Sequence, residues 1–278
     1  MDWNVCSIPP VASFLLLWIA MGVGGSQSSI ASPQPRHGKS ADATVTILYD
    51  NNRYDRRLKT AWGFSCLVRG LEKSILFDTG GDGHTLLANM KQLGVEPSEV
   101  DIVVLSHIHG DHTGGLAAFL EKNHRVVVYM PSSFPADFKK AVLGMGARVE
   151  DISEAREIFP SVYTTGEVGD GIREEALALK FTEGLVVITG CAHPGIVNMV
   201  RKAREISGQE TVCLVMGGFH LAGESPSRVK SIAKELRSLS VKKLAPCHCS
   251  GDGTRKELKK EFGADYLESG VGMKITVH

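Results

Sequence analysis

The sequence predicts an α/β fold, a four-layer αββα sandwich in which two mixed β-sheets pack face to face and helices cover the outer faces. Two observations lead to this fold class. A cluster of β-rich segments begins at residue 44, and after it apolar strands alternate with amphipathic helices as far as the C-terminus. The chain has 278 residues, 43% of them hydrophobic, so it can fill a core between two sheets. The sequence shows no repeat of solenoid period.

The expected elements follow from hydrophobic periodicity. Strands are short runs rich in Val, Ile and Leu, helices carry apolar residues three and four positions apart, and Gly, Pro or Asp mark most borders. The expected strands are residues 44–50, 64–70, 74–80, 100–106, 125–131, 174–181, 185–190, 211–218, 242–247 and 272–278. The expected helices are residues 84–93, 116–123, 136–146, 195–207, 227–239 and 253–263.

The charge balance points to small-molecule chemistry. The 31 basic and 31 acidic residues cancel, and no Lys/Arg run interleaved with aromatics appears, so we expect no nucleic-acid partner. A small anionic substrate is the expected partner, and the oligomeric state stays open.

Residues 1–43 differ in composition from the remainder, which we take as one domain spanning residues 44–278. Residues 11–25 form an apolar run, followed by a polar stretch with small residues. This pattern indicates a signal peptide with a linker, because the run is short for a membrane-spanning helix. A membrane anchor stays open, since residues 1–10 contain Asp2 and no Lys or Arg. A buried N-terminal helix is the structural alternative.

The cysteines bear on the compartment. Cys6 lies in the leader, and the other five of the six cysteines do not resemble a disulfide framework. The leader therefore favours export, to the periplasm or outside the cell or onto a membrane, whereas the thiols favour a reducing cytoplasm as the alternative.

One segment carries an unusual density of metal-ligand side chains. "SHIHGDHTGG" places His107, His109, Asp111 and His112 within six positions, after the strand expected at residues 100–106. In an extended loop, residues two apart project to the same side, so His107 and His109 can present nitrogens to one ion. Asp111 and His112 lie further on and can face a second ion or the first ion's water. The alternative is that these four residues are ordinary polar loop residues held by hydrogen bonds.

Other candidate ligands stand at strand ends, where one sheet edge would bring them to the same place. His193 in "TGCAHPG" and His248 in "APCHCSG" each follow an expected strand. His220 in "MGGFHLAGES" does so too, either as a ligand or as a group that orients one. Asp78 in "ILFDTGG" is expected to orient a ligand histidine or to support the ligand loop through hydrogen bonds, with direct metal binding as the alternative.

Three cysteines lie near these histidines. Cys191, Cys247 and Cys249 stand within two residues of His193 or His248, which raises the hypothesis of a thiolate ligand. The alternative is that they are small buried residues at strand ends.

With these residues in place, the chain resembles the metallo-β-lactamase-fold hydrolase superfamily. His107, His109, Asp111 and His112 match its "HxHxDH" signature. The stretches "AWGFSCLV", "ILFDTGG", "TGCAHPGI", "MGGFHL" and "PCHCSG" are similar to the branch of dihydropterin-methyl-ribofuranosylaminobenzene phosphate synthases. The likeness spans roughly residues 44–278, nearly everything after the leader, which favours a single domain of αββα architecture.

The resemblance implies a dinuclear site. The first ion would be held by His107, His109 and His193, and the second by Asp111, His112 and His248. The superfamily also carries an aspartate that bridges both ions, at the end of the strand expected at residues 211–218. Here Gly217, Gly218, Phe219 and His220 stand instead, without a carboxylate. Either His220 partly substitutes, or the second ion binds weakly and depends on the substrate. An anionic substrate such as a phosphate ester would then supply the missing bridge.

The expected activity is metal-assisted hydrolysis. One or two Zn²⁺ ions would lower the pKa of a water molecule toward about 7, with Fe or Mn as alternative ions. Asp111 would position that water and take its proton, and His220 would stabilise the leaving oxygen or contact a phosphate. The alternatives are transfer of a dihydropterin from its pyrophosphate to a ribofuranosylaminobenzene phosphate, iron-dependent redox chemistry, and metal binding without catalysis.

Overall fold

The computed structural model describes residues 3–5 and 42–278. The apolar run at residues 11–25 lies outside the described residues, so the signal peptide or anchor and the domain boundary at residue 43 stay predictions. In the described part of the chain, no helix is long and apolar enough to cross a membrane.

Two mixed β-sheets form the centre of the described chain. The first has eight strands in the order β1-β14-β2-β3-β4-β5-β6-β7, and the second has six in the order β13-β12-β11-β10-β9-β8. The first sheet consists of β1 (Trp3–Val5), β2 (Ala43–Tyr49), β3 (Ser65–Arg69), β4 (Ile75–Phe77), β5 (Ile102–Val104), β6 (Val127–Pro131), β7 (Arg148–Ile152) and β14 (Lys274–Val277). The second consists of β8 (Arg156–Phe159), β9 (Val162–Thr164), β10 (Leu177–Phe181), β11 (Gly184–Thr189), β12 (Val212–Gly218) and β13 (Val241–Cys247).

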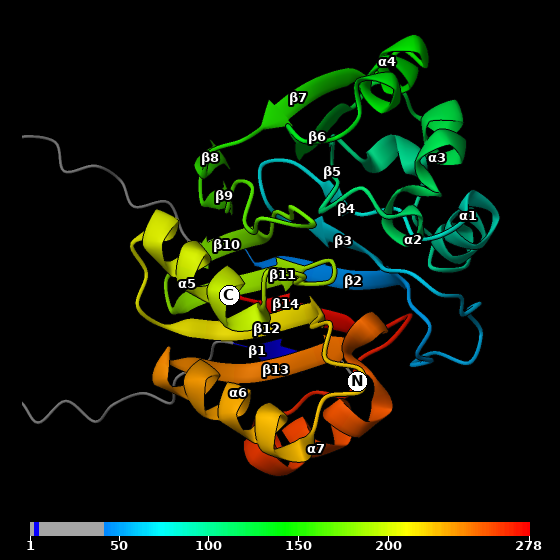
Figure 1. Ribbon diagram of the computed structural model, residues 1–278. Helices are drawn as coiled ribbons and strands as arrows, with labels where there is room; N and C mark the ends of the chain where they lie inside the picture. Colours follow the sequence, from blue (N-terminus) through cyan, green and yellow to red (C-terminus); the bar gives the residue numbers. More distant parts are fainter. Residues whose placement is uncertain (1–2, 6–41) are drawn as a thin grey trace, which may run out of the picture.

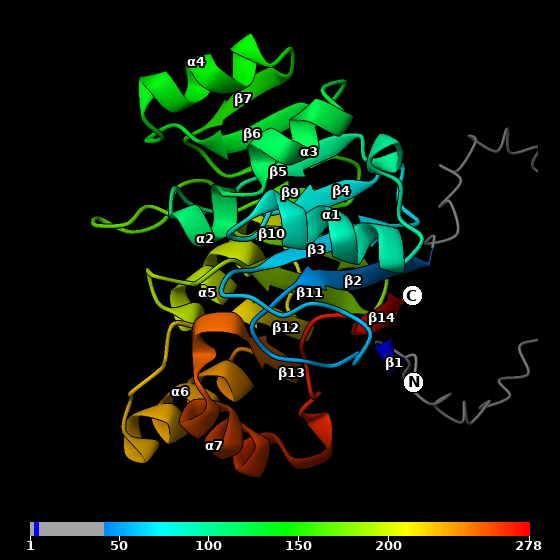
Figure 2. The same cartoon turned by 90° about the vertical axis from the view of Figure 1, so that its right-hand side faces the viewer.

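Helices cover the outer faces of both sheets (Figures 1 and 2). Apolar side chains of α1 (Gly83–Gln92), α3 (Leu116–Lys122) and α4 (Ala136–Gly144) join a core cluster with the first sheet. Those of α5 (Ile196–Ser207), α6 (Pro226–Ser238) and α7 (Asp252–Phe262) join a cluster with the second sheet. The short elements are α2 (Gly110–Thr113), η1 (Pro97–Glu99), η2 (His248–Ser250) and η3 (Gly263–Asp265).

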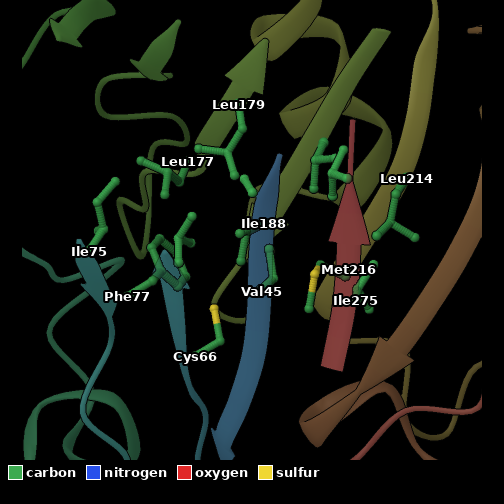
Figure 3. Close-up of a cluster of buried hydrophobic side chains, with 14 of the residues drawn as sticks. Val45, Cys66, Ile75, Phe77, Leu177, Leu179, Ile188, Leu214, Met216 and Ile275 are labelled. Carbon is green, nitrogen blue, oxygen red and sulfur yellow. The ribbon is translucent and has the colours of Figure 1, made fainter. Parts of the chain in front are cut away.

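A third apolar cluster fills the space between the two sheets. Figure 3 shows side chains of the first sheet facing those of the second, and all of them are buried. The central strands are buried on both faces, which explains why β5 and β11 are continuous apolar runs instead of alternating ones. The labelled side chains are Val45, Cys66, Ile75, Phe77, Leu177, Leu179, Ile188, Leu214, Met216 and Ile275.

The predicted αββα sandwich is confirmed, and three details differ. The stretch at residues 148–164 forms β7, β8 and β9, which the sequence analysis left without elements. The strand expected at 174–181 begins only at Leu177, because the Glu175 N–H donates to the carbonyl of Ser106. The ligand segment is not extended throughout, since Gly110–Thr113 form α2. In addition, Trp3–Val5 pair in parallel with β14.

Candidate metal centre

The candidate ligands follow five strands whose carboxyl ends meet at one edge of the sandwich. Strands β4 and β5 run parallel in the first sheet, and β11, β12 and β13 run parallel in the second. Parallel neighbours end on the same side, so the loops that follow them converge. Asp78 follows β4, the His107–His112 segment follows β5, His193 follows β11, His220 follows β12, and His248 follows β13.

Three histidines form the first group of potential ligands. One ring nitrogen from each of His107, His109 and His193 lies within 4.8 Å of the other two. The ring centroids of His107 and His193 are 4.8 Å apart, and those of His109 and His193 are 4.9 Å apart. The loop after β5 and the loop after β11 therefore share this group, as expected.

Asp111, His112 and His248 form the second group, with the same spacing of donor atoms. The Oδ2 of Asp111 lies 3.3 Å from Nε2 of His248 and 3.8 Å from Nε2 of His112. The ring centroids of His107 and His112 are 4.2 Å apart, so the two groups are adjacent.

Asp78 controls which ring nitrogens face this centre. Its carboxylate accepts hydrogen bonds from the Ser106 N–H at 2.7 Å and from the Ser106 hydroxyl at 2.8 Å. Since that hydroxyl donates to Asp78, it accepts from Nδ1 of His107 at 2.9 Å. The same carboxylate lies 2.7 Å from Nδ1 of His112. Both histidines are thereby set to present Nε2 to the centre, the arrangement typical of ligand histidines.

The loop after β2 determines which ring nitrogen of His248 faces the centre. Nδ1 of His248 lies 3.0 Å from Oδ1 of Asn51, and the Asn51 amide donates to the His248 carbonyl at 3.2 Å. Asp50 accepts the His248 N–H at 3.2 Å. Nε2 of His248 is therefore also directed to the centre.

Two buried nitrogens test whether a metal ion fits. Within the described residues, Nε2 of His193 and Nε2 of His248 have no hydrogen-bond partner. The Asp111 carboxylate is near Nε2 of His248 but lies outside hydrogen-bond geometry. Buried polar atoms are rarely left unpaired, and a divalent cation would satisfy both. The donor set of imidazoles and one carboxylate fits such an ion.

The electrostatics keep the first group in its metal-binding form. Burial, and then the neighbouring histidines, hold the pKa of His107 far below its usual range. Burial, and then His220 and His109, lower the pKa of His193 to about 4. Neutral imidazole is the form that binds metals, so these two side chains are ready at neutral pH.

The second group carries the negative charge. Burial acts to raise the pKa of Asp111, but His248 and His112 outweigh it and hold that pKa below its usual range. Burial lowers the pKa of His112, but Asp78 and then Asp111 outweigh it and raise that pKa. The carboxylate of Asp111 is thus ionised, and 22% of its side chain is exposed.

Backbone strain is concentrated at this centre. Asp78, Ala192, His220 and His248 all have positive φ angles, from 48° to 60°. Only two other non-glycine residues of the described chain do so, Ser161 and Ser240. Such conformations cost about 1–3 kcal/mol each and tend to occur where a side chain must be aimed for function.

Glu174 is a structural residue that the sequence analysis missed. Its fully buried carboxylate accepts three backbone N–H groups, those of Cys191 and Ala192 at 2.8 Å and that of His193 at 2.9 Å. It fixes the loop that carries His193. In the sequence Glu174 stands in a polar stretch, and nothing there indicates its partners.

The three cysteines near the ligands differ in position. The Sγ of Cys191 lies 3.2 Å from Nε2 of His112. Cys249 accepts the His220 N–H at 3.3 Å and lies beside Cys191. Hydrogen bonding by Cys191, together with His220, lowers the pKa of Cys249 against the effect of burial, and the same contact raises the pKa of Cys191. Cys247 is buried beside Asp50 and joins none of the described ligand groups.

His220 stands at the rim. Its ring centroid is 4.2 Å from that of His193, and it is exposed. It lines a cavity of about 380 Å³ beside the centre, together with His193, Arg201 and Arg228. On the other side, the ring of Trp62 lies 4.8 Å from that of His248 and the residue is 58% exposed. No pattern in the sequence indicates a role for Trp62 at this place.

Fold and site together define a family. The model of the metallo-beta-lactamase superfamily matches residues 63–198. The chain is 30% identical to 7,8-dihydropterin-6-methyl-4-(beta-D-ribofuranosyl)-aminobenzene-5'-phosphate synthase of Methanocaldococcus jannaschii, over 83% of this chain and 95% of that protein. The chain belongs to the metallo-β-lactamase superfamily.

Solved structures agree with this assignment. A metal-dependent hydrolase of the beta-lactamase superfamily has a TM-score of 0.71 and 28% identity, over 84% of this chain and 98% of that one. The metallo-beta-lactamase fold protein YhfI from Bacillus subtilis has a TM-score of 0.63 at 16% identity, over 84% of this chain and 99% of that one. The second likeness concerns the fold alone.

Proposed function

We propose that this protein is a zinc-dependent hydrolase of a small anionic ester, preferentially a phosphate ester. One observation carries the proposal: two adjacent ligand groups, His107/His109/His193 and Asp111/His112/His248, include the buried Nε2 atoms of His193 and His248, which have no hydrogen-bond partner among the described residues. Two groups of this kind side by side are the arrangement used for two-metal hydrolysis.

The chain's own residues have distinct roles in this reaction. Bound zinc would lower the pKa of a water molecule toward about 7 and polarise the scissile group. The ionised, partly exposed carboxylate of Asp111 would orient that water and accept its proton. His220, at the rim, would donate to the leaving oxygen.

The cavity beside His193 and His220 offers arginine side chains to an anion. Arg201 and Arg228 line it, as does Ile196 at the N-terminus of the twelve-residue helix α5. Glu224 and Glu235 line it as well, and Arg201 pairs with Glu235 at 3.6 Å. Arginine donors and the free N–H groups of a helix N-terminus both stabilise negative charge. A phosphate ester bound there would place its phosphate next to the ligand groups.

Metal content and turnover test the proposal. The full-length protein should contain zinc by elemental analysis, which separates zinc from iron or manganese. It should hydrolyse a member of a panel of phosphodiesters, lactones and thioesters, and a chelator should stop it. His107→Ala or His109→Ala should abolish zinc binding and turnover, whereas the exposed His124 is a control site for His→Ala. Turnover by metal-free H107A protein would overturn the proposal.

The 30% identity to the Methanocaldococcus jannaschii synthase favours a second candidate, transfer of a dihydropterin from its pyrophosphate to an arylamine ribose phosphate. In that reaction the same centre would stabilise the pyrophosphate leaving group. Release of pyrophosphate that requires the arylamine would establish the transferase. Release without the arylamine, with water as acceptor, would establish the hydrolase.

A further inference from the structure

The strand that lacks the expected bridging carboxylate has no room for one. Strand β12 ends at Gly217 and Gly218. A Cβ atom on Gly218 would lie 2.3 Å from the Gly190 carbonyl oxygen and 2.7 Å from Sγ of Cys249. A Cβ atom on Gly217 would lie 2.0 Å from the Thr189 carbonyl oxygen. The backbone at Thr189 and Gly190 and the Cys249 sulfur occupy the space that a side chain at Gly217 or Gly218 would need, so any bridging anion would have to come from elsewhere.

The sulfur of Cys191 lies between the two ligand groups. It is 3.2 Å from Nε2 of His112, and the residue is only 3% exposed. It belongs to three sets of potential donor atoms, and the atoms of each set lie within 4.8 Å of one another. These sets include members of both ligand groups. The three sets are Cys191 with His107 and His112, Cys191 with His193 and His220, and Cys191 with His248 and Cys249.

The local fold holds Cys191 in this place. It directly follows Gly190 at the end of β11, and its N–H donates to the buried carboxylate of Glu174 at 2.8 Å. Cys249 is its neighbour on the other side, with Sγ 3.7 Å from the Cys191 carbonyl oxygen. Two buried contacts therefore hold the backbone of Cys191, which does not belong to an exposed loop.

We propose that Cys191 supplies, as a thiolate, the bridging ligand between the two metal ions, in place of the carboxylate that β12 lacks. This inference rests on the proposed two-metal function. On metal binding the S–H bond breaks, the proton leaves to the buffer, and sulfur bonds to both ions. Each ion would then have four protein ligands, which is the number zinc prefers. Cys249 lies beside Cys191 and accepts the His220 N–H, and it has no part in the proposed bridge.

X-ray absorption at the zinc edge tests the bridge in the zinc-loaded, full-length wild-type protein, kept reduced throughout. A sulfur scatterer at about 2.3 Å, distinct from nitrogen at about 2.0–2.1 Å, identifies a thiolate ligand. A bridge predicts one sulfur for each of two zinc ions. The wild-type spectrum needs no substitution, so it decides the question even where a variant fails to fold.

Two variants assign the sulfur to its residue. Cys191→Ala should lose the sulfur scatterer and, with Co²⁺ as the probe, the near-ultraviolet sulfur-to-metal absorption band. Its affinity for the second ion should fall by about tenfold or more, since a ligand contributes at least as much as the groups that orient one. Cys249→Ala, the matched neighbouring thiol, and Cys66→Ala, a buried thiol in β3, should keep the scatterer and the band.

The failures are distinguishable. Two bound zinc ions without any sulfur scatterer would overturn the bridge and leave the proposed hydrolase intact. An average of half a sulfur scatterer per zinc ion would mean that the thiolate binds only one ion, and would also overturn the bridge. Loss of the absorption band in C249A, with retention of the band in C191A, would overturn it as well. A protein that binds no divalent metal at all would overturn the proposed function itself.

Discussion

The carboxylate of Asp78 and the imidazole of His112 form a pair with no solvent-exposed side-chain surface, with Oδ2 2.7 Å from Nδ1. The same carboxylate reaches His107 through the Ser106 hydroxyl. One buried charge thus orients one histidine of each ligand group, which makes it a sensitive point of the metal centre.

Replacing Asp78 by Asn should weaken metal binding without unfolding the protein. Asn has the same size and tolerates the left-handed backbone of this position, φ 55°. It removes the charge behind both histidines, so zinc affinity should fall by about 10–100-fold. Competition with a chromogenic chelator measures it. Asp101→Asn removes a carboxylate that accepts a surface N–H and should have no effect. Unchanged affinity in D78N would contradict the orienting role.

Glu174→Ala should destabilise the loop that carries His193. It leaves three backbone N–H groups without their acceptor, and each buried unpaired donor costs about 1–3 kcal/mol. We expect the free energy of unfolding in denaturant to fall by roughly 3 kcal/mol or more, and zinc stoichiometry to fall with it. Glu174→Gln should recover part of both losses. Glu72→Ala, at an exposed position, provides the baseline, and equal stability of E174A and E72A would refute this account.

Gly218→Asp, which would restore a carboxylate to the end of β12, should not create a bridging ligand. Its Cβ would overlap the Gly190 carbonyl oxygen and the Cys249 sulfur. Overpacking of this kind costs about 1–3 kcal/mol or more, so the midpoint of thermal unfolding should drop and zinc content should not rise. Gly253→Asp, where nothing lies within 4 Å of the added Cβ, serves as the control. A G218D protein that is as stable as G253D and contains more zinc would contradict this prediction, because it would show that the site makes room for the new carboxylate.

Glu175 should make stability depend on pH. Burial, opposed by the hydroxyl of Thr164 and reinforced by Asp78, raises the pKa of Glu175 from 4.5 to about 8. Its stabilising contribution is therefore complete below pH 4.5. It declines as pH rises toward 8, because the unfolded chain releases a proton that the folded chain retains. The slope from this one group is at most about 1.4 kcal/mol per pH unit.

Glu175→Gln, neutral at every pH, should flatten that slope. Denaturant unfolding at several pH values between 5 and 8, compared with wild type, gives the difference. Glu121→Gln changes an exposed carboxylate and should leave the wild-type slope as it is. A slope in E175Q equal to that of wild type would mean that Glu175 is ionised in the fold.

The sequence predicts that the candidate ligands lie close together, because their places follow from strand order. His193 and His248 come directly after apolar runs, and the carboxyl ends of parallel strands meet at one edge. Strands β7 and β8 escape prediction because most of their side chains are partly or fully exposed and charged, so they lack an apolar pattern.

Other features depend on contacts between distant segments. Glu174 is buried because a loop seventeen to nineteen residues further along the chain covers it. Asn51, which orients His248, is 197 positions away from it. The position of Cys191 between the two ligand groups likewise arises only when both sheets are assembled, so it cannot be predicted from residue spacing or composition.

The two ligand groups have one further consequence. Each group takes residues from both sheets: the segment after β5 belongs to the first sheet, and His193 and His248 follow strands of the second. Bound ions would therefore act as cross-links between the two halves of the sandwich, in addition to the apolar side chains between the sheets and hydrogen bonds such as those between Asn51 and His248. Metal loading would then stabilise the whole domain against unfolding as well as supply its chemistry. The free energy of unfolding would rise by about 2.7 kcal/mol for one site when the free ion is a hundredfold above its dissociation constant.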